Sequence, residues 1–171
     1  MKIRQDFVTN SSSSSFILCF DSKKSYKEFL ENCDWLDYNQ LKELVEQRIQ
    51  KTSKVKRKED SLELLKRYYT IQKYHKKLVD EKFGDGEHDN SVEDILAIGK
   101  YTRSKEFDTK VSKLLEADDE YKNKRKRIKE AKDVVEMEVW DSDGGLLEWA
   151  IRNGFLESNF YQYLILRWNI G

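Results

Sequence analysis

Apolar residues recur at alternating steps of four and three through the charged middle of the chain, residues 39–132. Such spacing places a narrow apolar stripe along a helix, and a narrow stripe is buried only against another helix. The pattern therefore predicts long helices folded back on one another in the manner of a coiled coil. The stripe positions are Leu64, Tyr68, Ile71, His75 and Leu78, then Phe107, Val111, Leu114, Tyr121 and Ile128, with Asp118 and Arg125 filling two places of the second frame.

The N- and C-terminal segments show strand patterns instead. Residues 16–20 (FILCF) form an apolar run typical of a buried strand, and residues 133–140 alternate valine and methionine with glutamate. Residues 161–170 (YQYLILRWNI) are apolar on both faces, which predicts a central strand or one covered on both sides. We therefore expect a single α+β domain, predominantly α, with a small three-stranded sheet. Its base comprises residues 1–38 with 133–171, and its helical arm is a long charged insertion, residues 39–132.

Capping and breaking residues set the expected ends of the helices. Residues 51–58 (KTSKVKRK) combine weak helix formers with like charges, so we expect them to interrupt the arm. Glycines at positions 84 and 86 predict a helix end near Phe83. The other expected boundaries are an Asp21 cap for a helix from Ser22 to Cys33, a restart at Ser61 through Asp60 and Glu63, a Ser91–Asp94 capping box, and one helix from Ser104 to Lys132.

Charged residues make up 37% of the chain and apolar residues 38%, so the core is thin relative to the surface. The net charge is zero, but the middle of the chain is basic and the remainder is acidic. Residues 39–132 contain 25 Lys and Arg and 19 Asp and Glu, whereas the rest of the chain contains 7 and 13. Such separation favours oriented association with a charged partner or between copies of the protein. It argues against a general polyanion binder, whose basic excess dominates the whole domain.

The expected compartment and the expected lack of a cofactor rest on sequence features that are missing. No apolar run approaches the ~20 residues that a bilayer span needs, and the N-terminus lacks the apolar segment of a secretory signal. Two cysteines, Cys19 and Cys33, do not make a secreted disulfide framework, so we expect reduced thiols in a cytoplasmic protein without a membrane partner. Glycine-rich phosphate loops are absent, and His75 and His88 have no partner motif, so we expect no cofactor and no nucleophilic catalytic site.

Two basic runs are the first candidates for a nucleic-acid site, because each holds five cations available for salt-sensitive phosphate contacts. Neither run interleaves aromatic residues as single-strand platforms do, and acidic residues 118–120 directly precede the second run and screen it. A solvated helix face or loop explains the same runs, so nucleic acid stays an alternative partner. The candidate residues are Lys54, Lys56, Arg57 and Lys58 in the first run, and Lys124, Arg125, Lys126 and Arg127 in the second.

Four carboxylates near the end of the second predicted strand are candidates for a Mg²⁺ site: Glu136, Glu138, Asp141 and Asp143. Such a cluster supports phosphoryl chemistry in metal-dependent phosphoesterases and nucleases. Those enzymes normally add a nearby Lys or His, whereas Arg152 is the only cation between residues 133 and 153. A polar strand face followed by a turn explains the same residues without a metal.

Five consecutive serines, Ser11, Ser12, Ser13, Ser14 and Ser15, lie between apolar residues on both sides. A flexible tether is one interpretation of such a run. A serine-rich turn held at both ends also offers hydroxyl and backbone N–H groups to an anion, and serines accept phosphate. We therefore mark the run as a candidate for modification or anion binding.

The string from Met1 through Phe16, with FVTNSSSSSF at its centre, resembles an N-terminal signature of small uncharacterised proteins. Those proteins come mainly from low-GC Gram-positive bacteria, some archaea, and their phages. The resemblance covers about a tenth of the chain and brings no catalytic residues. It implies a prokaryotic or phage accessory protein.

The sequence as a whole favours a non-enzymatic, protein-binding accessory protein. Its narrow helical stripes and its charge separation indicate contact with another protein, either a host protein or a second copy that forms a homo-oligomer through the helices. By analogy with phage accessory proteins, inhibition of a host defence factor is one form that this role takes. The alternatives are nucleic-acid binding through residues 51–58 and 122–127, and a Mg²⁺-dependent phosphoesterase or nuclease at residues 136–143.

Overall fold

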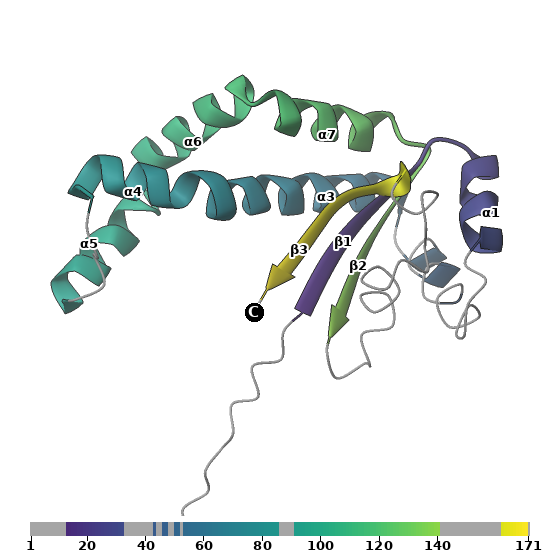
Figure 1. Ribbon diagram of the computed structural model, residues 1–171, viewed down its shortest axis with the longest axis horizontal. Coiled ribbons are helices and arrows are strands. Elements are labelled where there is room, and N and C mark those ends of the chain that lie inside the picture. Colours follow the sequence, from purple (N-terminus) through teal and green to yellow (C-terminus); the bar gives the residue numbers. More distant parts are fainter. Residues whose placement is uncertain are drawn as a thin grey trace, which may run out of the picture. The chain divides into compact units, whose positions relative to one another are not determined.

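The computed structural model describes residues 13–32, 43, 46, 47, 50, 51, 53–85, 91–140 and 162–170 (Figure 1). The chain divides into two compact units. The sheet unit comprises residues 1–58 with 131–171, and the helical unit comprises residues 59–130. Mostly helical and with one three-stranded antiparallel sheet, the chain has the predicted α+β class.

The sheet has the strand order β2-β1-β3, with β1 (Ser13–Phe20) in the centre, β2 (Asp133–Trp140) on one side and β3 (Leu164–Ile170) on the other. Both pairings are antiparallel, and Ile17 lies opposite Glu136 and Leu166. The C-terminal strand is therefore an edge strand, and the first strand takes the central place. The alternative expected for β3, cover on both sides, is confirmed by the burial of its consecutive residues Ile165 and Leu166.

The apolar run after the serines explains the central position of β1. Phe16, Ile17, Leu18, Cys19 and Phe20 are all buried, so both faces of the strand are covered. Helix α1 (Lys23–Asn32) follows directly and contributes an aromatic contact, with the ring centroids of Phe20 and Phe29 5.2 Å apart. This helix is capped by Ser22, whose hydroxyl accepts a hydrogen bond from Ser25 N at 3.0 Å, and the predicted Asp21 cap was wrong.

One continuous helix of 30 residues is formed by α3 (Lys54–Tyr69), the π-helical segment η1 (Thr70–His75) and α4 (Lys76–Phe83). It ends where predicted, because Gly84 has a φ of 95°, a conformation that favours glycine. The predicted restart at Ser61 was wrong. The helix already begins at Lys54, where the Ser53 hydroxyl accepts from Lys56 N at 3.3 Å, and Ser61 lies buried inside it.

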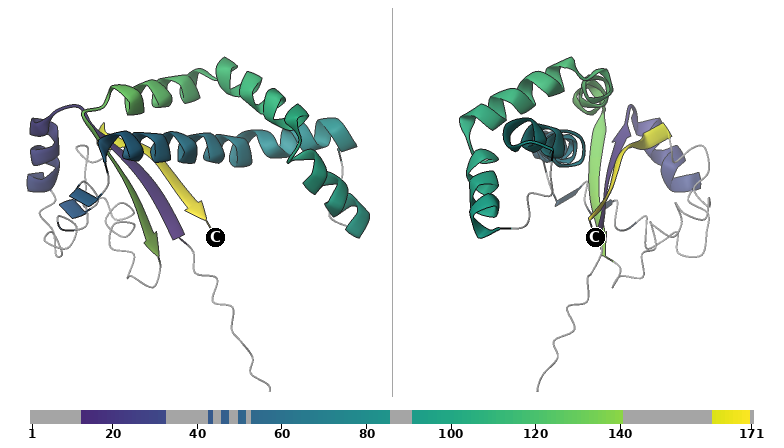
Figure 2. Two further views of the ribbon diagram at one scale, coloured as in Figure 1. Left: turned by 180° about the vertical axis from the view of Figure 1, so that it is seen from behind. Right: turned by 60° about the vertical axis from the view of Figure 1, so that its left-hand side comes forward.

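The helical unit returns through α5 (Val92–Tyr101), α6 (Lys105–Ala117) and α7 (Asp119–Glu130). In Figures 1 and 2, α6 and α7 run back beside the long helix. The Ser91 hydroxyl accepts from Asp94 N at 3.0 Å, which confirms the predicted cap of α5. The single helix expected from Ser104 to Lys132 is instead two helices, which meet at Asp118 in an extended conformation.

The buried row of the long helix differs from the predicted stripe. It runs through Ser61, Leu65 and Tyr69 at steps of four, then reaches Tyr74 at a step of five and Leu78 at a further step of four. The step of five coincides with η1, because π-helical hydrogen bonds join residues five apart. Of the predicted positions Leu64, Tyr68, Ile71, His75 and Leu78, only Leu78 is buried, and Ile71 is exposed.

The second predicted stripe is largely confirmed. Phe107, Val111, Tyr121 and Ile128 are buried, while Leu115 takes the place expected for Leu114, and Arg125 is exposed. These side chains meet the long helix through aromatic contacts. Ring centroids are 5.3 Å apart between Tyr69 and Tyr121 and 6.1 Å apart between His75 and Phe107. Among the described residues, no helix combines the length and apolar character that a membrane span requires.

Candidate functional site

Asp118 lies between α6 and α7 and is the centre of a polar cluster in the helical unit. Its Oδ1 accepts a hydrogen bond from Tyr121 N at 3.0 Å, which caps the first turn of α7. Its Oδ2 accepts from Lys73 Nζ at 2.7 Å and from the Tyr74 hydroxyl, both in η1. One carboxylate, 6% exposed, therefore caps one helix and joins it to another.

The protonation states of this cluster are fixed by its hydrogen bonds. Burial alone raises the pKa of Asp118, but hydrogen bonds from Lys73, Tyr74 and a backbone N–H outweigh it and lower the pKa to about 2. Burial and the Asp118 carboxylate raise the pKa of Tyr74, and burial and the neighbouring Glu120 raise the pKa of Tyr69. At neutral pH the carboxylate is ionised and both phenols are protonated. None of these groups is therefore poised for general acid–base catalysis.

The cations around this cluster are also engaged. Lys124 Nζ lies 2.8 Å from a Glu120 oxygen, and Lys73 Nζ lies 4.0 Å from the other. Both ammonium groups also lie near the ring of Tyr69, at 5.6 and 5.5 Å from its centroid, within the range of a cation–π interaction. The ionised groups of the cluster are thus paired with one another, and we interpret the cluster as a structural link between helices.

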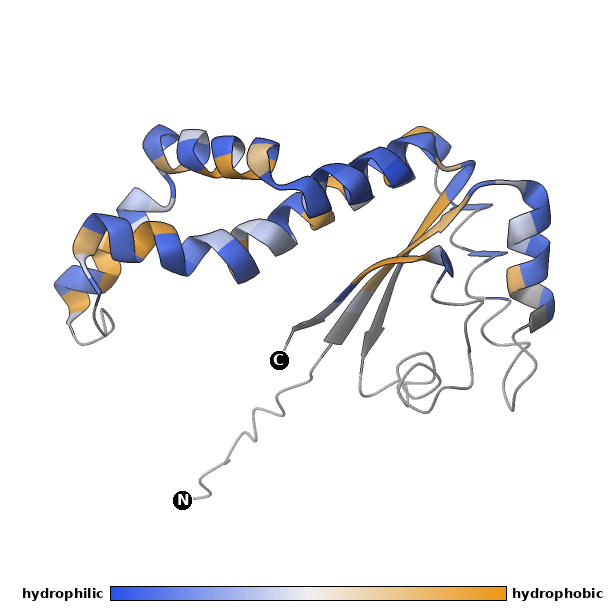
Figure 3. Cartoon of the chain, turned by 45° about the horizontal axis from the view of Figure 1, so that its top comes forward, coloured by the Kyte–Doolittle hydropathy of each residue, from blue (hydrophilic) through white to orange (hydrophobic). Residues whose placement is uncertain are grey.

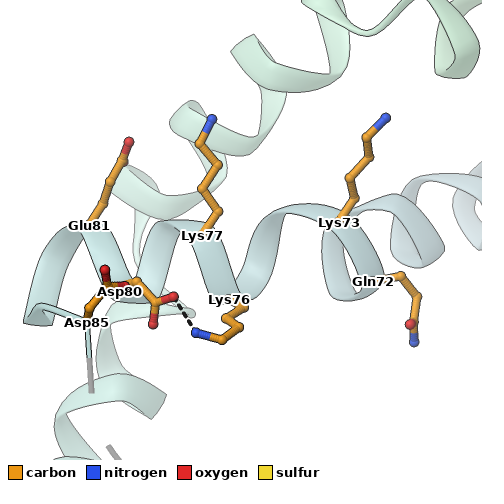
Figure 4. A pocket seen from close by; sticks show the side chains of 7 residues that line it. All are labelled: Gln72, Lys73, Lys76, Lys77, Asp80, Glu81 and Asp85. Carbon is orange, nitrogen blue, oxygen red and sulfur yellow. Dashed lines mark hydrogen bonds and ion pairs between the residues drawn. The ribbon is translucent and has the colours of Figure 1, made fainter. Parts of the chain in front are cut away.

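A shallow depression of about 720 Å³ lies along η1 and α4 (Figure 4). Figure 4 shows Lys73, Lys77 and Glu81 pointing to one side of the helix, while Gln72 and Lys76 point to the other. The side chains therefore diverge instead of converging on a bound molecule. The remaining lining residues are Asp80, which is paired with Lys76, and Asp85.

The candidate nucleic-acid residues lie in different units, and several are paired. In the sheet unit, Lys54 and Lys56 are exposed, but Arg57 is buried and its guanidinium lies 3.4 Å from Asp133. In the helical unit, two of the four cations have carboxylate neighbours within α7, namely Lys124 with Glu120, and Lys126 with Glu130 at 3.9 Å. Lys58 and Arg127 are half-buried, and Arg125 is exposed.

The four carboxylates of the predicted metal site are only partly described. Glu136 is half-buried on β2 opposite Ile17, and the backbone of Glu138 pairs with Ser15. Asp141 and Asp143 lie outside the described residues. Within the described ranges, no group of three or more His, Cys, Asp or Glu side chains is arranged to hold a metal ion.

The serine run extends into the sheet. The strand begins at Ser13, three residues before the predicted start, and the side chain of Ser15 is buried. Ser13, Ser14 and Ser15 pair with residues of both β2 and β3, so this part of the run lies in the centre of the sheet. Ser11 and Ser12 lie outside the described residues, and modification or anion binding there stays a prediction.

An exposed apolar face on α5 is the surface feature that sequence reasoning missed. Val92, Ile95 and Leu96 are 72%, 54% and 67% exposed, and they are three of the six large apolar side chains that are exposed in the described part of the chain. Their spacing of three and four residues was visible in the sequence, but the same spacing serves a covered helix equally well. Figure 3 shows apolar positions along this helix. Comparison with protein-family models, with curated proteins and with solved structures gives no match for the chain.

Proposed function

We propose that this chain is a non-enzymatic, protein-binding accessory protein whose contact surface is the apolar face of α5 in the helical unit. The observation that carries the proposal is the exposure of Val92, Ile95 and Leu96 on one side of one helix. Isolated apolar residues on a surface need no explanation, whereas a contiguous apolar stripe indicates an interaction site.

Elsewhere in the helical unit, ion pairs join neighbouring helices. Between α4 and α6, Lys82 Nζ lies 3.2 Å from Glu106, and Lys110 Nζ lies 3.9 Å from Glu81. The apolar side of α6 is buried through Phe107, Val111 and Leu115. Helix α5 carries three of the six large apolar side chains that are exposed among the described residues, so it offers a partner more apolar surface than any other described helix.

The resemblance of the N-terminal string supports an accessory role in a phage or another mobile element. A non-enzymatic protein acts in such a role by occupying a surface of its target. We propose that the protein inhibits a host defence factor by binding to its surface in this way. The paired cations of α7 and the burial of Arg57 give no support to the nucleic-acid alternative.

A photo-reactive amino acid in place of Leu96 tests the protein-binding function in the native host. We expect irradiation to form a covalent adduct with a protein that mass spectrometry identifies. The matched control carries the same amino acid in place of Lys113, an exposed residue of α6, and we expect no adduct from it. Equal adduct formation at the two positions, or none at position 96, would show that the α5 face is not a protein contact.

A further inference from the structure

Helix α5 is anchored on one side and uncovered on the other. Its buried residue, Tyr101, packs between Phe83 and Phe107, with ring centroids at 5.7 and 5.4 Å. At 100° per residue, the opposite side of the helix carries Val92, Ile95, Leu96 and Gly99 in an i, i+3, i+4, i+7 stripe. The stripe has the spacing of a helix-packing surface, and its three large side chains are exposed.

The stripe ends at Gly99, beside the side chain of Arg103. This glycine has no side chain, and a Cβ added there would lie 3.2 Å from an Arg103 guanidinium nitrogen. That guanidinium lies beside the glycine because Arg103 Nε donates to Gly99 O at 2.9 Å. The Arg103 side chain therefore covers the backbone at this end of the stripe, and Val92, Ile95 and Leu96 form its open apolar part.

Two opposite charges flank the stripe without partners among the described residues. Glu93 and Lys100 are both exposed, and Lys100 is seven positions after Glu93 along α5. Seven residues turn the helix to within about 20° of the starting direction, so both side chains lie on the same flank of the stripe. They are also about 10 Å apart along the axis, too far for an ion pair within one helix.

These charges complement a second, antiparallel copy of the same helix. A two-fold axis perpendicular to two facing helices brings the same flank of each together, with their directions reversed. Glu93 of one copy then lies against Lys100 of the other, and the symmetry repeats the pair. A parallel pair places both Glu93 side chains at one level and both Lys100 side chains at another, which loses the two attractions.

We propose that α5 pairs with α5 of a second copy of this chain in an antiparallel, two-fold symmetric dimer. This inference deepens the proposed function and rests on it, because it names the protein that covers the α5 face. Val92, Ile95 and Leu96 of both copies form the apolar centre, with the two-fold axis passing close to Leu96. The area that this stripe can bury is smaller than the roughly 800 Å² per partner of a standard interface. We therefore expect a reversible dimer with a dissociation constant on the order of 10 µM.

Sedimentation velocity of the full chain across a concentration series measures this dimer directly. We expect the mass to rise from monomer to dimer between about 1 and about 100 µM. Leu96→Glu should remove the dimer at every concentration, because it places two buried negative charges at the symmetric centre. Val55→Glu is the matched control, since Val55 is also 67% exposed but lies on α3, and it should leave the dimer unchanged.

Charge exchange separates this geometry from non-specific adhesion of apolar surfaces. Glu93→Lys and Lys100→Glu should each weaken the dimer about tenfold at low salt, because each replaces two attractions with two repulsions. The double variant should return the dissociation constant to within about twofold of the unchanged chain. Circular dichroism of each variant checks that the helices remain. A dimer that forms but is not rescued by the double exchange contradicts the antiparallel pairing.

The outcomes distinguish this inference from the proposed function. A monomer at all concentrations, together with a position-96 adduct to a different protein, overturns the second-copy inference and leaves the protein-binding function standing. A monomer that forms no adduct at position 96 overturns both.

Discussion

At the scale of single residues, Asp118 shows how one side chain decides the course of the chain. The sequence around it contains no glycine or proline, so the only local signal for a break is the preference of Asp for a helix N-cap. The break arises because the carboxylate accepts from Lys73 and Tyr74 across the hairpin and from Tyr121 N in the next helix. A tertiary cause of this kind is not visible in helix propensity.

Asp118→Ala removes both the cap and the cross-helix bonds, so we expect it to lower the free energy of unfolding by roughly 2–4 kcal/mol. Asp118→Asn keeps a capping side chain and loses only the charge, so it should cost about half as much. Urea denaturation followed by circular dichroism gives both values. Asp119→Asn is the control, because Asp119 is 86% exposed, and it should change stability by no more than about 0.5 kcal/mol. Equal losses of unfolding free energy from the substitutions at positions 118 and 119 would contradict the role of Asp118 in linking the helices.

The same carboxylate gives stability a defined pH dependence. Folding lowers the pKa of Asp118 from 3.8 to about 2, so the unfolded chain binds more protons than the folded chain in this range. The stabilisation is fully present above about pH 5 and is lost as the pH falls toward 2; it amounts to roughly 2 kcal/mol. Urea midpoints measured between these limits should fall less steeply in Asp118→Asn than in the unchanged chain. Identical slopes would contradict the lowered pKa.

At the scale of elements, the sequence predicted strands better than helix faces. The FILCF run and the alternation in residues 133–140 indicate strands on their own, because period-two and uniformly apolar patterns are local signals. The predicted stripe of the long helix differs from the observed buried row because η1 contains one extra residue between Tyr69 and Tyr74. A regular alternation of three- and four-residue steps does not allow for this residue. The open face of α5 was missed because periodicity shows that a stripe exists and not what covers it.

Deletion of Gln72, an exposed residue of η1, tests the role of the π-helical turn. Removing one residue returns the Tyr69-to-Tyr74 step to four, so an ordinary α-helix keeps both ends of the buried row on one face. We expect the unfolding free energy to change by no more than about 1 kcal/mol. Deletion of Lys66 in α3 is the control, and because it turns the rest of the helix by about 100°, it should abolish cooperative unfolding. Equal damage from both deletions would show that η1 does not accommodate an extra residue.

At the scale of the whole molecule, each of the two structural units is electrically balanced, although the sequence segments 39–132 and the remainder are not. The helical unit, residues 59–130, contains 17 Lys and Arg and 17 Asp and Glu, and the sheet unit contains 15 of each. Neither unit therefore carries the basic excess that sequence-independent binding of nucleic acid requires. The apolar face of α5 is left as the principal unsatisfied surface among the described residues.

We accordingly expect no shift of duplex or single-stranded DNA or RNA in a gel at about 50 mM salt, where phosphate contacts are strongest. Lys54→Ala with Lys56→Ala should then give the same result, because there is no shift for the loss of these two exposed lysines to remove. A shift that weakens steeply with salt and is lost in this double variant would establish the alternative function at the first basic run.

Hydrogen exchange of the α5 amides at two protein concentrations tests the central claim most directly. If a second copy covers this helix, protection of residues 95–101 should rise between about 1 and about 100 µM protein, while protection of α6 stays constant. Protection of α5 that does not depend on concentration would contradict the account.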